Sequence, residues 1–174
     1  MIYGKPTAFE IYDVAKRMRQ RDYDEIVCTT YSQNREELAA FLGETWSACE
    51  TTIGCGTKED GIIAVLTYVP LRPNVWSFGM FATDDFQKIG AQLTRLIIKR
   101  IIGAIEQTGA HRVECQSIEG YEEVHNWLEF LGLKKESLIK GFGRNGENFI
   151  TFAYVKESVE PVKWAGSGRI ENVR

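Results

Sequence analysis

The side chains best suited to nucleophilic or metal chemistry are the four cysteines and two histidines of this 174-residue chain. A structural zinc site needs about four Cys or His ligands in closely spaced pairs. Only Cys49 and Cys55 lie close together, and no Cys-x-x-Cys pair is present. We therefore expect no metal site and no disulfide, and we expect the cysteines to pack as small apolar side chains. The residues are Cys28, Cys49, Cys55, Cys115, His111 and His125.

His125 and Cys115 are the candidates for a base and a nucleophile. An imidazole has an ordinary pKa of about 6.5, close to neutral pH. On a predicted helix, His125 lies one turn after Tyr121 and three residues before Leu128. A lone histidine on a helix is usually structural, and Cys115 has no clearly placed base partner that would activate its thiol. We expect neither residue to be catalytic.

The segment Gln87-Lys88-Ile89-Gly90-Ala91-Gln92 is a candidate for ligand binding, because it lies at the start of a predicted long helix. Backbone N–H groups at a helix start can hold a phosphate, and glycine lets the chain approach a ligand closely. The alternative interpretation is that the segment is simply the first turn of a packed helix.

Helices and strands alternate along the chain, which predicts an α/β (α+β) fold. A capping box at Thr7 and Glu10 begins the first helix, and Gly109 ends the longest one. Asn145-Gly146 predicts the turn of a C-terminal β-hairpin. The predicted helices are 7–21, 34–43, 84–108 and 121–131, and the predicted strands are 46–53, 61–71, 75–82, 111–118, 138–143 and 148–156.

Length and composition indicate one domain followed by a tail. Hydrophobic residues make up 44% of the chain, which suffices for one sizeable core. The apolar pattern ends after Lys156, so we predict a domain over residues 1–157 and an extended tail over residues 158–174. The isolated Trp164 in this tail is a candidate for docking on a partner, since aromatic side chains dominate binding hot spots.

Charge and hydropathy argue against two classes of partner. A formal net charge of −3 and a pI near 5.5 give no basic patch for nucleic acid. No apolar run reaches the roughly 18 residues that a membrane-spanning helix needs, and the first residues show no signal-peptide core. We therefore expect an intracellular origin, with neither nucleic acid nor a membrane as partner.

The order of elements from about residue 8 to residue 156 resembles the GCN5-related N-acetyltransferase (GNAT) fold. That fold is a mixed central sheet flanked by helices, with a C-terminal β-hairpin. In the family, a phosphate-binding loop of the pattern Q/R-x-x-G-x-G/A precedes the long helix, and the segment from Gln87 to Gln92 is similar to it. The resemblance implies that coenzyme A contacts Gln87, Ile89, Gly90, Ala91 and Gln92, with the amides of Ile89 to Gln92 on its pyrophosphate.

This loop departs from the family pattern in two respects. Gln92 stands where the pattern has a small residue, and Asp84 and Asp85 add negative charge beside an anionic ligand. The sequence also departs from the family pattern outside this loop, in the run from Leu128 to Leu133, which resembles the family's helix ending Y-e-k-x-G-F. Leu128 stands where the family commonly has a tyrosine as general acid, and leucine has no proton to donate. The resemblance therefore implies no catalytic residue and no cofactor, or acetyl-CoA if the chain is an enzyme.

A narrower resemblance involves the segments 124–133 and 144–152, which are similar to GNAT-like virion proteins of short-tailed bacteriophages. The second segment has Arg144-Asn145-Gly146 at its predicted turn. This resemblance implies a structural or accessory component of a phage particle, located in the virion and, during assembly, in the host cytoplasm. Its partners would be other virion proteins, reached through the tail and Trp164, and its oligomeric state in the particle is left open.

Two alternatives to this structural role stay open. One is an active GNAT N-acetyltransferase that uses acetyl-CoA on a small-molecule or protein amine, for which positioning of the amine matters more than an acid. The other is a host-directed protein-binding module, which an exposed apolar patch around Trp46 or Trp76 would favour.

Overall fold

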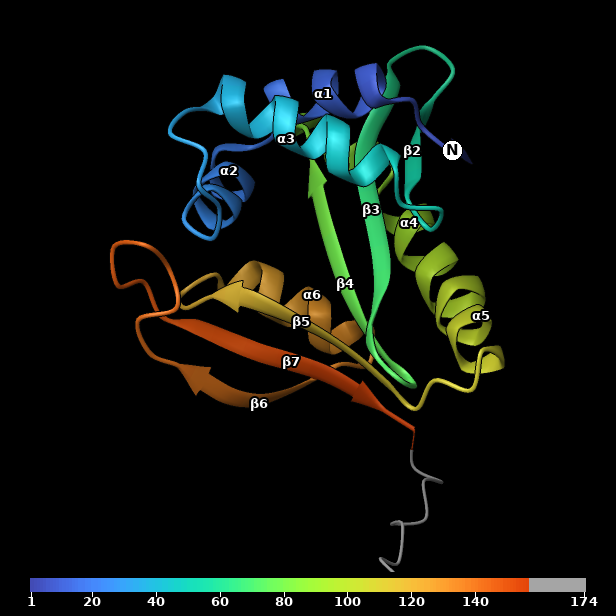
Figure 1. The fold of residues 1–174 in the computed structure, drawn as a ribbon. Helices are drawn as coiled ribbons and strands as arrows, with labels where there is room; N and C mark the ends of the chain where they lie inside the picture. The colour runs from blue at the N-terminus through green and yellow to red at the C-terminus, as the bar shows by residue number, and fades with distance from the viewer. Residues whose placement is uncertain (157–174) are drawn as a thin grey trace, which may run out of the picture.

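A seven-stranded mixed sheet forms the centre of the protein in the computed structural model, which describes residues 1–156 (Figure 1). The spatial order is β1-β2-β3-β4-β5-β7-β6, and every neighbouring pair is antiparallel except β4 and β5. This is the mixed sheet that the sequence predicts. The strands are β1 (Ile2–Gly4), β2 (Ile53–Thr57), β3 (Gly61–Arg72), β4 (Val75–Ala82), β5 (Arg112–Ile118), β6 (Lys134–Ile139) and β7 (Phe149–Val155).

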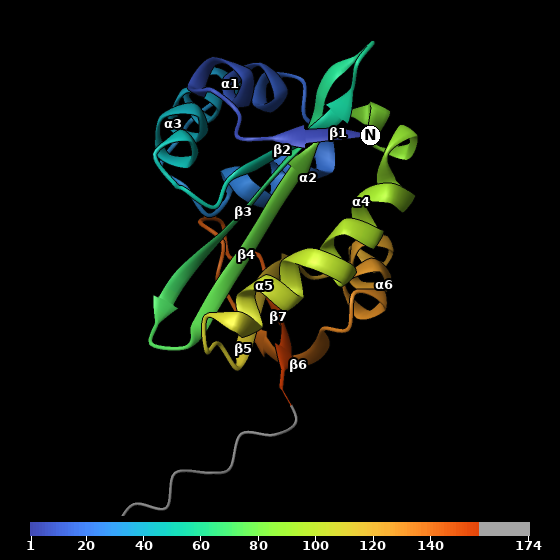
Figure 2. The same ribbon diagram turned by 90° about the vertical axis from the view of Figure 1, so that its right-hand side faces the viewer.

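Helices cover both faces of the sheet, and each face has its own core. On one face α1 (Ala8–Lys16) and α3 (Arg35–Ser47) pack on β3 and β4, with Leu38 and Phe81 fully buried between them. On the other face lies a long helix made of α4 (Gly90–Leu96), the π-helical turn η2 (Ile97–Ile101) and α5 (Ile102–Gln107). Beside this helix lies α6 (Glu122–Phe130) (Figure 2).

The parallel strands β4 and β5 separate soon after they pair. Their ladder joins Val75–Ser77 to Arg112–Glu114 and then ends, while β4 stays paired with β3 and β5 with β7 along their whole lengths. Beyond Ser77 the two strands diverge as the arms of a V (Figure 1). The facing edges of Phe78–Ala82 and Cys115–Ile118 therefore lack a strand partner, which makes this opening the natural place for a ligand.

The predicted first helix is two helices in the structure. The helix α1 ends at Lys16, and α2 (Gln20–Val27) follows after a break. At the break Met18 bridges to Thr83, and the N–H of Arg19 donates to the carbonyl of Ala82 at 2.8 Å. These contacts with β4 hold the backbone of Arg19 in an extended conformation, so tertiary hydrogen bonds override local helix propensity.

Two further predictions differ from the structure. The strand predicted over residues 46–53 is wrong, because α3 continues to Ser47 and Trp46 packs on Phe81 at 5.0 Å between ring centroids. The predicted start of the long helix is a separate 3-10 turn, η1 (Asp84–Lys88). Trp164 and the predicted tail lie outside the described residues, and the domain boundary stays a prediction.

The C-terminal hairpin is present, but Asn145-Gly146 does not form a tight two-residue turn. A loop over residues 140–148 joins β6 to β7, and it docks on the C-terminal end of α2. The backbone N–H of Arg144 donates to the carbonyl of Cys28 at 2.8 Å, and its guanidinium donates to the carbonyls of Val27 and Ser32. Arg144 thus satisfies carbonyls that a helix end leaves without partners.

We expect Arg144→Ala to lower the free energy of unfolding by about 1 kcal/mol, because the carbonyl of Val27 at the end of α2 and that of Ser32 in the following loop lose a charged donor. Urea denaturation measures this change, and amide hydrogen exchange should accelerate selectively in α2. The matched control is Lys140→Ala in the same exposed loop. Equal stability of the two variants would contradict the capping role.

Candidate functional site

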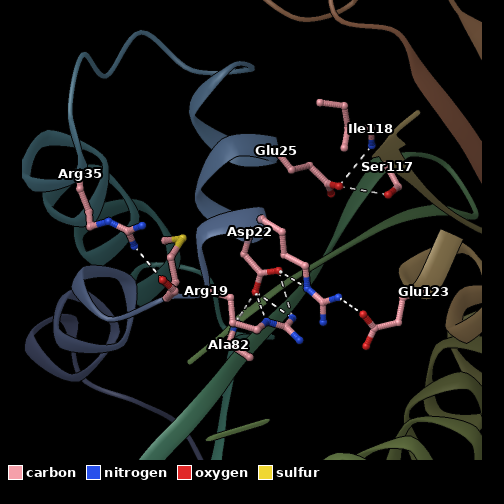
Figure 3. A network of polar contacts seen from close by, with 10 residues as sticks. Arg19, Asp22, Glu25, Arg35, Ala82, Ser117, Ile118 and Glu123 are labelled. Carbon is pink, nitrogen blue, oxygen red and sulfur yellow. Dashed lines mark hydrogen bonds and ion pairs between the residues drawn. The ribbon is translucent and has the colours of Figure 1, made fainter. Parts of the chain in front are cut away.

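The helix α2 spans the open end of the V between β4 and β5. Asp22 accepts the N–H of Ala82, at the end of β4, at 2.8 Å. One turn later, Oε2 of Glu25 accepts the N–H of Ile118 at 3.2 Å and the hydroxyl of Ser117 at 3.0 Å, both at the end of β5 (Figure 3). Two carboxylates of one short helix therefore hold the two strand ends.

A cavity of about 300 Å³ lies below α2, between the diverging strands. Its floor is apolar and its opening carries charged side chains, which is the usual composition of a small-molecule site. No group of residues suited to hold a metal ion occurs within residues 1–156. The cavity is lined by Arg19, Arg21, Asp22, Glu25, Phe78, Gly79, Met80, Phe86, Cys115, Gln116, Ser117, Glu123, Val124, Trp127 and Leu128.

Glu25 is the residue in this cavity with acid–base properties suited to neutral pH. Burial raises the pKa of its carboxyl group to about 7, and the hydrogen bonds from Ile118 and Ser117 oppose that rise. Both hydrogen bonds go to Oε2, and within the described residues Oε1 has no hydrogen-bond partner. The carboxylate can therefore accept a proton from a ligand in the cavity near pH 7.

Asp22 and Arg19 form a structural pair at the same opening. The guanidinium of Arg19 donates from Nε and Nη2 to the carboxylate of Asp22 at 2.8 to 3.0 Å, and it lies 4.8 Å from the ring centroid of Phe86. Burial raises the pKa of Asp22, and Arg19 opposes this effect. Because these contacts hold the start of α2 in place beside Phe86 of η1, and the backbone of Ala82 bonds to both residues, we assign the pair to positioning.

The free edge of β4 supplies a backbone donor to the cavity. Ala82 directs its N–H to Asp22 and its carbonyl to Arg19, both on the side away from β3. Residues two apart in a strand direct their backbone groups to the same edge. Phe78 belongs to the same set, but its N–H is used in the last pair of the ladder with β5, so the N–H of Met80 faces the opening, where it can stabilise negative charge on an oxygen atom.

The predicted coenzyme-binding residues lie at the start of α4, and the structure gives each a different environment. Gln87, Ala91 and Gln92 are exposed, whereas Ile89 is buried in the core and its amide donates to the carbonyl of Phe86. The Ile89 amide is therefore already paired, and the predicted contact of this segment with coenzyme A stays a prediction. The first hydrogen bond of the helix runs from Leu93 to Ile89, and no side chain caps the preceding N–H groups. The amides that remain available are those of Gly90, Ala91 and Gln92.

Gly90 is explained by packing. A Cβ atom at this position would lie 3.2 Å from the ring of Phe86, so the ring needs a glycine beneath it. The acidic pair before the helix is partly neutralised, because Lys88 lies 3.0 Å from the carboxylate of Asp85 and 2.8 Å from that of Asp60.

The residues weighed for catalysis divide between the cavity and the core. Leu128 lines the cavity floor and is 3% exposed. Cys115 also lines the cavity, but burial raises the pKa of its thiol to about 12, so it is not a nucleophile at neutral pH. The ring of His125 is buried against Phe152, with Nε2 3.0 Å from the carbonyl of Ile118. His125 is thus a structural residue, as expected.

Comparison with known proteins identifies the fold. No family model and no curated protein match the sequence. Solved acetyltransferase structures superpose with TM-scores of 0.61 to 0.69 at 8% to 15% identity.

Three of these structures illustrate the extent of the likeness. The ribosomal-protein-S5-alanine acetyltransferase from Vibrio fischeri matches with a TM-score of 0.62 and 15% identity, over 91% of this chain and 94% of that one. The ribosomal-protein-alanine N-acetyltransferase from Brucella melitensis matches with a TM-score of 0.64 and 10% identity, over 89% of this chain and 99% of that one. A GNAT-family acetyltransferase from Bacillus anthracis matches with a TM-score of 0.61 and 10% identity, over 88% of this chain and 93% of that one. The chain therefore has the GNAT fold, and the cavity lies between its two diverging strands.

Proposed function

We propose that this protein is an N-acetyltransferase that moves the acetyl group of acetyl-CoA to an amine in the cavity, with Glu25 as the general base. The observation that carries the proposal is a buried carboxylate with a pKa of about 7 and a free Oε1, held by the end of β5 in a cavity that β4 also lines. The fold shared with acetyltransferases supports it by analogy.

The residues present fit coenzyme A along a continuous path. The thioester end would lie in the cavity, against the backbone of Phe78 and Met80, and the pyrophosphate would meet the amides of Gly90 to Gln92. A second groove adjoins the cavity at Trp127, which lines both. Trp127 is fixed there by a hydrogen bond from Nε1 to Oγ1 of Thr94 at 2.9 Å. This groove suits an adenosine and its phosphates, since it is lined by Ala91, Thr94, Arg95, Ile98, Lys99, Trp127 and Phe130.

In this arrangement Glu25 removes a proton from the bound ammonium group, and the free amine attacks the thioester carbonyl carbon. The N–H of Met80 on the edge of β4 stabilises the negative charge that develops on the carbonyl oxygen. The bond from carbon to sulfur then breaks, and coenzyme A leaves as a thiolate, which takes up the second proton that the nitrogen loses as the amide forms. Leu128 supplies no acid for that step, so positioning and the base carry the catalysis.

The structural role in a phage particle, which the sequence favoured, remains a proposal without support from these comparisons. It rests on segments 124–133 and 144–152, and in the structure Arg144 has the local task of capping α2. The proposed virion partners, the virion location and the docking role of Trp164 are likewise untested. A host-binding module is not favoured, because Trp46 and Trp76 are half-buried against Phe81 and Tyr68.

Calorimetry with acetyl-CoA tests the proposed function. We expect wild-type protein to bind with a Kd of about 10 µM or tighter. Val124→Trp should weaken binding at least about tenfold, because Val124 lines the cavity and a larger side chain would occupy it. The control, Glu129→Trp, places the same ring on an exposed position of the same helix and should bind as the wild type does. Absence of binding to the wild type would overturn the proposal.

A further inference from the structure

Two cations, Arg19 and Arg21, line the cavity, and they differ in how fully their donors are used. Arg19 is committed to Asp22 and to the ring of Phe86. Within the described residues Arg21 makes a single hydrogen bond, from Nη1 to Oε2 of Glu123 on α6, which is the dashed line at Glu123 in Figure 3. Arg21 is therefore the cation of the cavity that has donors to spare.

The spare donor is Nε of Arg21, which is buried and has no hydrogen-bond partner among the described residues. The nearest acidic atom, Oδ1 of Asp22, lies 4.0 Å from it, beyond hydrogen-bonding distance. An unsatisfied buried N–H costs stability unless a ligand completes it. A guanidinium binds a carboxylate best through two parallel N–H groups, one of which can be that of Nε. The unpaired Nε of Arg21 therefore indicates that the ligand carries a carboxylate.

Arg21 and Glu25 lie four residues apart on α2, so their side chains leave neighbouring points on one face of the helix. Both line the cavity. On the proposed function, the acceptor's amine lies against Glu25. We propose that the acceptor is an amino acid, whose amine contacts Oε1 of Glu25 and whose carboxylate contacts Nε and the second Nη of Arg21.

The ion pair between Arg21 and Glu123 does not block this binding mode. The side chain of Glu123 is 80% exposed, whereas that of Arg21 is 28% exposed. Ion pairs with an exposed partner contribute little, because water and salt screen them. A substrate carboxylate inside the cavity can therefore displace Glu123 and leave it in solvent.

Other classes of amine fit the same groups less well. A polyamine would place a second positive charge beside Arg21. Repulsion between these two charges would weaken the binding of a polyamine. The α-amine of a protein chain carries no carboxylate at the required distance. The other titratable groups that interact with Glu25 are Asp22 on its own helix, Cys28 at the end of that helix, Cys115 on β5 and Tyr121 before α6.

The test compares the proteinogenic amino acids with their decarboxylated amines as acceptors from acetyl-CoA, with release of the free thiol as the readout. We expect at least one amino acid to have a kcat/KM about 100-fold higher than its decarboxylated amine. Arg21→Gln should remove most of this preference, lowering kcat/KM for the amino acid and leaving that for the amine nearly unchanged. Glu123→Gln, which removes the competing carboxylate, should lower KM for the amino acid.

The outcomes separate this inference from the proposed function. If the wild type binds acetyl-CoA but uses amines as well as it uses amino acids, or uses no amino acid at all, the inference is wrong and the acetyltransferase proposal is not. If Arg21→Gln lowers transfer to both classes of acceptor equally, Arg21 has only a structural role and the inference fails. If the wild type does not bind acetyl-CoA, the proposed function itself is wrong. Calorimetry of acetyl-CoA binding to Arg21→Gln verifies that the variant is folded.

Discussion

Replacing Glu25 by glutamine is expected to lower kcat/KM for acetyl transfer by a factor of about 10² to 10⁴, the usual contribution of a general base. Glutamine keeps an oxygen that accepts the hydrogen bonds of Ser117 and Ile118, so α2 stays attached to β5. The loss would then report the missing base. In the wild type, kcat/KM should rise with pH and level off above a midpoint near 7, the pKa of the buried carboxyl group. The pH profile of Glu25→Gln should lack this rise.

Steady-state kinetics between pH 5.5 and 9 measure both effects, with any amine that the wild type accepts. The matched control is Asp24→Asn, which changes an exposed carboxylate on the same helix and should leave the rate close to that of the wild type. A Glu25→Gln variant with the wild-type rate and pH profile would remove Glu25 from the mechanism. Acetyl-CoA binding should be similar in all three proteins, because Glu25 lies on the acceptor side of the cavity.

The second large effect concerns stability. Folding raises the pKa of Glu25 from 4.5 to about 7, so the folded state holds this proton more tightly than the unfolded state does. The contribution of Glu25 to stability is therefore fully present below pH 4.5 and is lost as the pH rises to 7. This shift in pKa corresponds to a contribution of at most about 3 kcal/mol to the free energy of unfolding. We expect Glu25→Gln to be more stable than the wild type at pH 8 by up to about 3 kcal/mol.

Urea denaturation of both proteins at pH 4 and pH 8 tests this expectation. The difference between the two proteins should be small at pH 4, where Glu25 is protonated in the wild type. Burial also raises the pKa of Asp22, and its charge acts on Glu25, so the difference between the two proteins reports Glu25 together with this interaction. A difference that does not change with pH would show that Glu25 titrates normally. Stability sacrificed at a buried carboxylate is the pattern expected of a residue kept for function.

The two central strands of the sheet could be predicted well from the sequence, because their signal is local, whereas β1 and β2 were missed. The apolar run of β3 and the aromatic run of β4 (Val75–Ala82) appear in the sequence with nearly the observed bounds. The helix α2 could not be predicted as a separate element. It is eight residues long and mostly polar, and its bounds come from contacts with Ala82 in β4 and with Arg144 near the C-terminus.

The candidate site was missed for the same reason. Asp22 and Glu25 stand in a charged segment that the sequence presents as the solvated end of a helix. The partners that make Glu25 unusual, Ser117 and Ile118, lie 92 and 93 residues further along the chain. The available signal was the spacing of two carboxylates by one helical turn, with Arg21 directly before the first of them. Burial turns that spacing into a site, and burial depends on the tertiary structure.

The attachment of α2 to both strand ends also sets a limit on how the sequence can vary in length. Asp22 holds β4 and Glu25 holds β5, so the gap between the strands is matched to three residues of helix, about 4.5 Å along its axis. A single residue inserted between them would turn Glu25 by about 100° around the helix, away from Ser117 and the cavity. Insertions are tolerated in exposed loops such as that between β6 and β7, but not here. Homologues that keep the three-residue spacing should therefore keep the cavity, even where most other residues have changed.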